Sequence, residues 1–167
     1  MDPVLVLVQA FHILAGIVWL GGAVFMNVVI LPALLGLPVP EQRLMARRVI
    51  FGPERMMIGA ALVAAALGIV RGVAYGPIRS IESLATPYGI VWGFAIATTL
   101  SVFFVGARMT GPTAHALLDD DQMWASPSPE RVSAARQERF RRLRGSFRLE
   151  LIGILLVFGL MPILRFL

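Results

Sequence analysis

The chain has 167 residues, of which 57% are hydrophobic and only 15% are charged, and its mean hydropathy is +0.79. A soluble chain carries about a quarter charged residues and a disordered chain is poor in apolar ones, so this composition excludes both classes. The absence of cysteine excludes disulfides, thiolate zinc sites and iron–sulfur clusters. The net charge of +5 reflects fifteen arginines and no lysine, which excludes a lysine Schiff base.

Four apolar runs follow one another along the chain, each near the roughly 20 residues that a helix needs to cross a bilayer. They predict membrane spans at about residues 4–31, 56–76, 88–109 and 149–167. Pro32, followed by Gly36, Pro38 and Pro40, is expected to mark the end of the first span. The predicted fold is a single all-α domain, an integral membrane four-helix bundle over residues 1–167.

The arginines are distributed unevenly among the connections. The first connection (38–55) holds four and the third (110–148) seven, whereas the second holds only Arg79. The positive-inside rule places the first and third connections in the cytoplasm and both termini outside. We therefore attribute the basic character to orientation and to contact with anionic membrane lipids, and we expect no nucleic-acid binding.

The third connection divides into two parts. Asp119, Asp120 and Asp121 begin a polar loop, and a basic amphipathic helix is predicted from about residue 129 to 146, with Ser128 as N-cap and Pro129 in its first turn. This helix is expected to lie along the membrane surface or to continue straight into the fourth span. Its arginines suit a topology anchor, and docking of a specific lipid or partner is the alternative.

Small residues recur every four positions in the second and third spans. Close backbone approach drives helix association in membranes, so such stripes predict packing surfaces. We expect the two stripes to face each other across the short outer turn. The second span contributes Ala60, Ala64, Gly68, Gly72 and Gly76, and the third contributes Gly89, Gly93, Ala97 and Ser101.

Few polar side chains are placed at membrane depth, where each is a candidate for function. His12, with Gln9 one turn above it, and Arg71, with Tyr75 one turn above it, are all expected in the outer part of the membrane. In one shared pocket, Arg71 would receive a carboxylate or propionate and His12 would act as a neutral ligand for a metal. The alternative is that His12 donates a hydrogen bond to a neighbouring helix while Arg71 extends outward.

Two further polar groups are predicted near the inner surface. Arg108 ends the third span and Glu150 begins the fourth, so an ion pair between them is expected. His115 belongs to the cytoplasmic interface, at the opposite end from His12, and is not expected to bind the same atom.

The first span carries the segment Phe11-His12-Ile13-Leu14-Ala15-Gly16-Ile17-Val18-Trp19-Leu20-Gly21-Gly22, and Pro32-Ala33-Leu34 follows it. These motifs resemble the first helix of the CopD-like (copper resistance D) family of bacterial membrane proteins. They are also distantly similar to the HemJ-type proteins, in which a first-helix histidine binds b-type haem, and this role would carry over to His12. The resemblance implies a multi-pass protein of the bacterial inner membrane. HemJ-type oxidases use a lysine, which this chain lacks, so a non-enzymatic role is favoured.

Four functions remain open from the sequence. The first is binding of haem b by His12, with Arg71 at a propionate. The second is copper handling by His12 and Met26, although no cluster of methionines supports it. The third is an accessory or assembly subunit, acting as a homo-oligomer or within a larger membrane complex. The fourth, a proton-coupled transporter, lacks the usual carboxylate at membrane depth.

Overall fold

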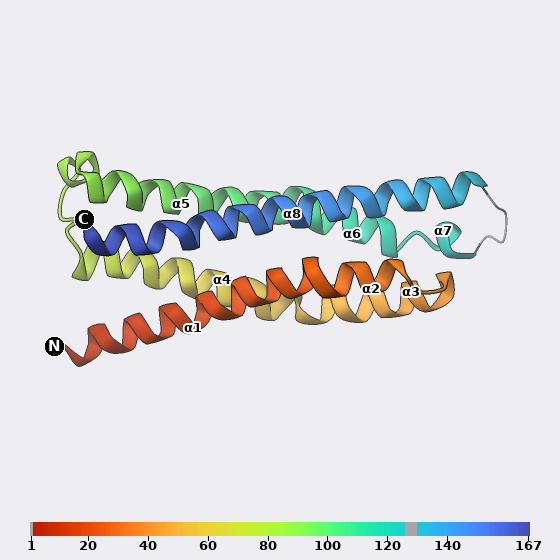
Figure 1. Cartoon of the computed structure of the whole chain (residues 1–167), viewed down its shortest axis with the longest axis horizontal. Helices are drawn as coiled ribbons and strands as arrows, with labels where there is room; N and C mark the ends of the chain where they lie inside the picture. The colour runs from red at the N-terminus through yellow and green to blue at the C-terminus, as the bar shows by residue number, and fades with distance from the viewer. Residues whose placement is uncertain (1, 126–129) are drawn as a thin grey trace.

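The structure, a computed structural model, describes residues 2–125 and 130–167, and the regular secondary structure in these two ranges is entirely helical. Within them lie four helical stretches, each long and apolar enough to cross a membrane, at Pro3–Leu35, Glu41–Tyr75, Pro87–Leu118 and Ala134–Phe166. They indicate a multi-pass membrane protein. The start of the first stretch and the end of the last lie at the same end of the molecule (Figure 1).

Each of the first three stretches consists of two helices. They are α1 (Pro3–Phe25) with α2 (Leu31–Leu35), α3 (Val39–Ala46) with α4 (Gly52–Val70), and α5 (Pro87–Val105) with α6 (Gly111–Leu118). A 3₁₀ turn at Glu82–Ala85 precedes α5, and a short helix, α7 (Asp121–Ala125), precedes the long α8 (Glu130–Phe166).

A wide π-helical turn joins the two helices of each pair, at Met26–Ile30, Arg47–Phe51 and Gly106–Thr110. In each case a proline is the second residue of the next helix. Proline lacks an N–H group and crowds the carbonyl one turn before it, so the helix passes it by widening. The first helical stretch therefore continues through Pro32 to Leu35, four residues beyond the position near residue 31 at which we expected the span to end.

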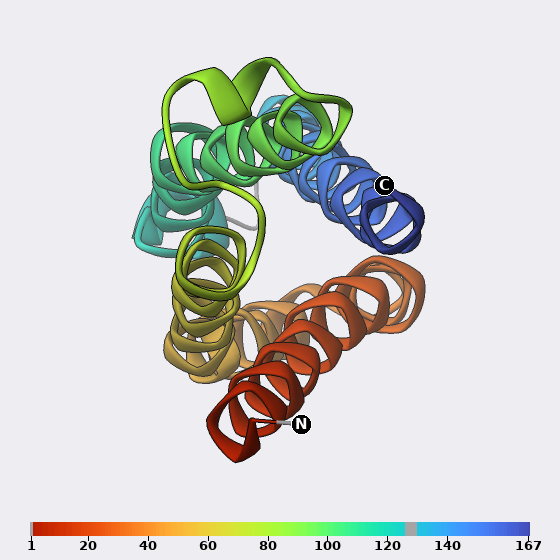
Figure 2. The same ribbon diagram turned by 90° about the vertical axis from the view of Figure 1, so that its left-hand side faces the viewer.

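The helices pack as two pairs, α1 along α4 and α5 along α8, with a smaller contact between α1 and α8 (Figure 2). One buried apolar cluster draws on all four helices and joins the pairs near the middle of the molecule. Trp19 of α1 stacks on Phe103 of α5 there, with ring centroids 6.1 Å apart. The buried members of the cluster are Trp19, Ala23, Ala61, Val102 and Ile154.

The small-residue stripes of α4 and α5 do not form the predicted interface with each other. Ala64 and Gly68 of α4 instead contact His12 of α1. Gly93 of α5 faces open space: apart from its own stretch of helix, no atom of the described residues lies within 4 Å of the position that a Cβ would take. From α5, the indole of Trp92 lies against Gly72, in the π-helical turn (Arg71–Tyr75) that follows α4.

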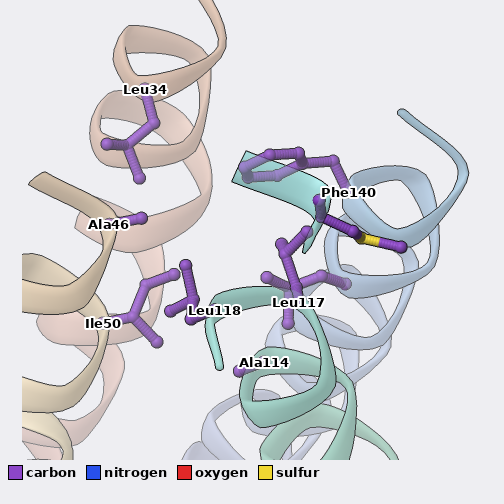
Figure 3. Packing of buried hydrophobic residues seen from close by; sticks show 9 residues of the cluster. Leu34, Ala46, Ile50, Ala114, Leu117, Leu118 and Phe140 are labelled. Carbon is purple, nitrogen blue, oxygen red and sulfur yellow. The ribbon is translucent and has the colours of Figure 1, made fainter. Parts of the chain in front are cut away.

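The far end of the molecule has a second apolar core. Its buried residues come from α2, α3, α6, α7, α8 and the turn after α3, as Figure 3 shows for the labelled side chains. The segments that we expected to be connections between the spans, 38–55 and 110–148, thus contribute helices that pack on one another. The buried members are Leu34, Ala46, Ile50, Ala114, Leu117, Leu118, Met123, Phe140 and Leu143.

The three consecutive aspartates after α6 form ion pairs around this second core. Asp119 pairs with Arg47 at 2.9 Å and Asp121 with Arg43 at 2.5 Å. Asp120 pairs with Arg139 of α8 at 3.4 Å. The polar run therefore connects α8 to the segment that contains α3, rather than forming an isolated loop.

The basic helix predicted at residues 129–146 is the first half of α8 and continues without a break into the last apolar stretch. Of the two arrangements considered from the sequence, the structure thus has the one in which this helix runs straight into the fourth apolar stretch. Ser128 and Pro129, expected at the start of the helix, lie outside the described residues.

The expected ion pair between Arg108 and Glu150 is absent from the described part of the chain. Glu150 of α8 instead accepts a hydrogen bond from the hydroxyl of Thr110, two residues after Arg108. Arg108 is exposed and its guanidinium lies 5.7 Å from the ring centroid of Phe104. The π-helical turn at Gly106–Thr110 changes which side of the helix faces α8, so that Thr110 is buried there.

Candidate functional site

A cavity of about 420 Å³ opens among α1, α4, α5 and α8. Small-molecule and cofactor sites usually have volumes of roughly 300–1,000 Å³ and mostly apolar walls with a few polar groups. This cavity fits that description, because its walls are mainly aliphatic and aromatic and its polar side chains are few. It lies between the shared core at Trp19 and the end of the molecule that holds both ends of the chain.

His12 of α1 lines the cavity and is half-buried. Its Nδ1 lies 2.9 Å from the backbone carbonyl oxygen of Ala64 on α4. A carbonyl oxygen can only accept a hydrogen bond, so Nδ1 carries the proton and donates it. The other ring nitrogen, Nε2, has no hydrogen-bond partner in the described part of the chain, and in the neutral imidazole it carries the free lone pair. The neutral ring is thus held in the tautomer in which Nε2 can bind a metal.

The small residues of α4 make room for this imidazole. A Cβ at Gly68 would stand 3.2 Å from Cε1 of His12, which is closer than most side-chain contacts. Ala64, one turn earlier, offers the carbonyl that His12 uses. Ala64 and Gly68, which we interpreted as part of a helix-packing stripe, therefore also allow His12 to lie against α4.

Gln9 and Arg71, which the sequence placed beside His12, both line the same cavity. Gln9 lies about one turn from His12 on α1, and its Oε1 is buried without a hydrogen-bond partner. Arg71 is half-buried in the π-helical turn that follows α4. No ion pair or hydrogen bond of its guanidinium occurs among the described residues. Both side chains retain polar atoms that a ligand can satisfy.

Tyr75 does not line the cavity, although the sequence suggested that it would. The helix ends directly after it, because Gly76 adopts an extended backbone. The tyrosine of the cavity is Tyr88, near the start of α5. The sequence analysis missed Tyr88 because it considered this helix only for its small residues, as a packing partner of α4.

Trp92 and Thr99 complete the wall that α5 provides. The indole N–H of Trp92 points to the carbonyl of Gly68 at 3.4 Å, and Thr99 donates its hydroxyl to Ala95 of its own helix at 2.9 Å. These contacts satisfy both groups within the protein. This wall therefore presents mainly aromatic and apolar surface to a ligand.

Met161 and Arg165, one turn apart on α8, form the opposite wall together with the ring of Phe158. The sequence contained a signal for this pair, since Arg165 is the one arginine in the outer part of the fourth apolar run. It was missed because nothing in the sequence shows that the last turn of α8 approaches α1 and α4. Met26, which we considered as a partner of His12, is buried in the turn after α1 and does not line the cavity.

His115 lies on α6, outside the cavity, with its Nδ1 3.2 Å from a carboxylate oxygen of Asp119. Across the described residues, no group of three or more histidine, cysteine, aspartate or glutamate side chains is arranged to hold a metal ion. A metal in the cavity would therefore have to bring most of its ligands with it.

Comparison with protein-family models, with curated proteins and with solved structures gives no match to this chain.

Proposed function

We propose that this chain is a CopD-like four-helix protein of the bacterial inner membrane that binds b-type haem through Nε2 of His12. The observation that carries the proposal is the hydrogen bond from His12 Nδ1 to the carbonyl of Ala64, at 2.9 Å. Histidines that bind metals almost always donate the other ring N–H to a carbonyl or carboxylate, which fixes the tautomer and the orientation of the ring.

The composition of the cavity favours haem over a bare metal ion. Haem supplies four of its own iron ligands and needs only an axial one from the protein. A single histidine in a largely apolar cavity can meet that need. Haem bound there would supply one-electron redox chemistry, whose potential depends on the axial ligand and on burial. His12 would hold the iron, and the apolar walls would exclude water.

Copper is the second candidate, and Met161 supports it. This thioether lines the same cavity as His12, which the sequence alone did not indicate. Thioether and imidazole are both ligands of copper(I). In this case the protein would take part in copper handling, as the family resemblance implies.

The proposed orientation places the cavity in the outer half of the membrane. Arg43, Arg47 and the arginines of the first half of α8 lie at the end with the second apolar core. By the positive-inside rule this end faces the cytoplasm, so the cavity and both ends of the chain face outward.

The visible absorption spectrum and the metal content of the purified protein test these assignments together. We expect a Soret band in the wild type that His12→Ala removes and His115→Ala retains. Stoichiometric copper without a Soret band would favour copper over haem as the ligand of His12. The absence of both, after expression with haem and copper supplied, would overturn the proposal and favour an accessory subunit.

A further inference from the structure

Two arginines face the cavity from opposite sides. Arg71 comes from the turn after α4 and Arg165 from the last turn of α8. Among the described residues that line the cavity, none is an aspartate or glutamate. Neither guanidinium forms an ion pair within the described part of the chain. The cavity therefore has two positive charges that the protein itself does not neutralise.

Uncompensated charge is costly at membrane depth, and charged side chains there are usually paired or face a polar cavity. Arg71 is half-buried, and Arg165 is exposed at the opening. Guanidinium groups bind carboxylates through two parallel N–H···O bonds. An anionic ligand would supply the charge that the walls lack.

The polarity of the cavity walls also changes along the helix axes. Both arginines lie within about one turn of the outer ends of their helical stretches. His12 lies deeper, roughly 13 Å along α1 from Pro3 at about 1.5 Å per residue. Beyond it the walls are formed by Trp19, Val157 and Phe158. A ligand that matches this gradient has an apolar body and acidic groups at its outer edge.

We infer that the cavity binds an amphipathic ligand with an apolar ring body and two acidic groups, one received by Arg71 and the other by Arg165. The inference rests on the proposed function because it concerns the same cavity, and it specifies the charge of the ligand. Arg165 is thereby assigned as a binding residue. Gln9, whose buried Oε1 has no partner, supplies an acceptor beside His12.

Metal-free porphyrins are suitable probes, because they match the body and the two carboxylates of haem without needing an axial ligand. Binding of free-base protoporphyrin and of its dimethyl ester to the detergent-solubilised protein is measured by quenching of tryptophan fluorescence. We expect the diacid to bind at least about tenfold more tightly than the diester, as hydrogen bonds to charged groups contribute roughly 1.5–3 kcal/mol.

Arg71→Gln and Arg165→Gln are each expected to weaken binding of the diacid about tenfold while leaving the diester unchanged. Arg79→Gln removes an exposed arginine that does not line the cavity and is the matched control. Arg165→Lys keeps the charge and should keep the preference for the diacid, which separates charge from folding.

Equal binding of diacid and diester, or unchanged binding in Arg165→Gln, would overturn the inference and leave these arginines to lipid headgroups. His12→Ala separates this result from the proposed function. This variant should still bind the metal-free diacid even though it no longer ligates iron. If His12→Ala loses the Soret band but still prefers the diacid, both assignments are supported. If the wild type has a Soret band but binds diacid and diester equally, only the inference about the arginines is contradicted.

Discussion

Nδ1 of His12 donates a hydrogen bond to the backbone carbonyl of Ala64, a residue 52 positions later in the chain, at 2.9 Å. The bond links α1 to α4 at the cavity, and it fixes the orientation of the imidazole and the proton on Nδ1, so that Nε2 of the neutral ring is the nitrogen able to bind a metal. Because a backbone carbonyl is the acceptor, no side-chain substitution on α4 removes the bond directly. Substitutions that displace the ring test its role instead.

Gly68→Leu should weaken haem binding about ten- to a hundredfold, because the new side chain would occupy the place of the His12 ring and overpacking costs about 1–3 kcal/mol. A Cβ alone would lie 3.2 Å from His12 Cε1. Haem titration followed at the Soret band measures the loss. Gly93→Leu is the control, since open space surrounds that position. Equal affinities of the two variants would show that Gly68 does not seat the histidine.

Gly72→Ala should lower the thermal stability of the detergent-solubilised protein, by about 1–3 kcal/mol, since the added methyl group would collide with the indole of Trp92. Gly59→Ala, on the same stretch, meets no atom within 4 Å and should be neutral or stabilising, because alanine favours a helix more than glycine does. A Gly72→Ala variant as stable as Gly59→Ala would contradict the close contact between Gly72 and Trp92.

The proposed orientation can be tested by cysteine labelling, since the chain has no cysteine of its own. A cysteine replacing Arg79, in the outer connection, should react with a membrane-impermeant maleimide on intact spheroplasts. A cysteine replacing Arg144, on the exposed side of α8, should react only after the membrane is opened. The reverse pattern would invert the assigned orientation.

The Arg43–Asp121 pair should make a pH-dependent contribution to stability. A hydrogen bond and charge from Arg43, with a smaller effect of Arg47, lower the pKa of Asp121 below its ordinary value. A lowered carboxyl pKa stabilises the fold above the ordinary pKa of about 3.9, and this contribution is lost as the pH falls through the lowered value.

Asp121→Asn should therefore reduce the melting temperature at pH 7 slightly, because the carboxylate is exposed, and the difference from wild type should shrink below about pH 4. Glu41→Gln, which removes an exposed carboxylate without an ion pair in the described part of the chain, is the control. A difference between wild type and Asp121→Asn that is constant from pH 7 to pH 3 would contradict the role of the pair.

The long apolar stretches were predictable because span length and composition reflect the thickness of the bilayer. The extension of two stretches to Leu35 and Leu118 could not be predicted, because a proline normally ends a helix. Nothing in the local sequence showed that a π-helical turn would allow the helix to continue beyond the proline. The pairing of the helices could not be predicted from the sequence either. Stripes of small residues show which faces can pack closely, but they do not show which helix each face meets.

For the cavity, the sequence identified the polar residues at membrane depth on the first two stretches. His12, Gln9 and Arg71 are brought together because α1 and α4 pack side by side. Tyr88, Met161 and Arg165 come from helices far along the chain, and their contribution depends on how α5 and α8 approach the first pair. Such distant contacts have no local sequence signal.

The most direct test of the central claim is rescue of a His12→Gly variant by free imidazole. This substitution removes the ligand and leaves a space against Ala64 and Gly68 that imidazole can fill. With haem supplied, the His12→Gly protein should lack the Soret band of the wild type, and millimolar imidazole should restore it. A His12→Gly protein that keeps the wild-type Soret band without imidazole would contradict ligation of haem by His12.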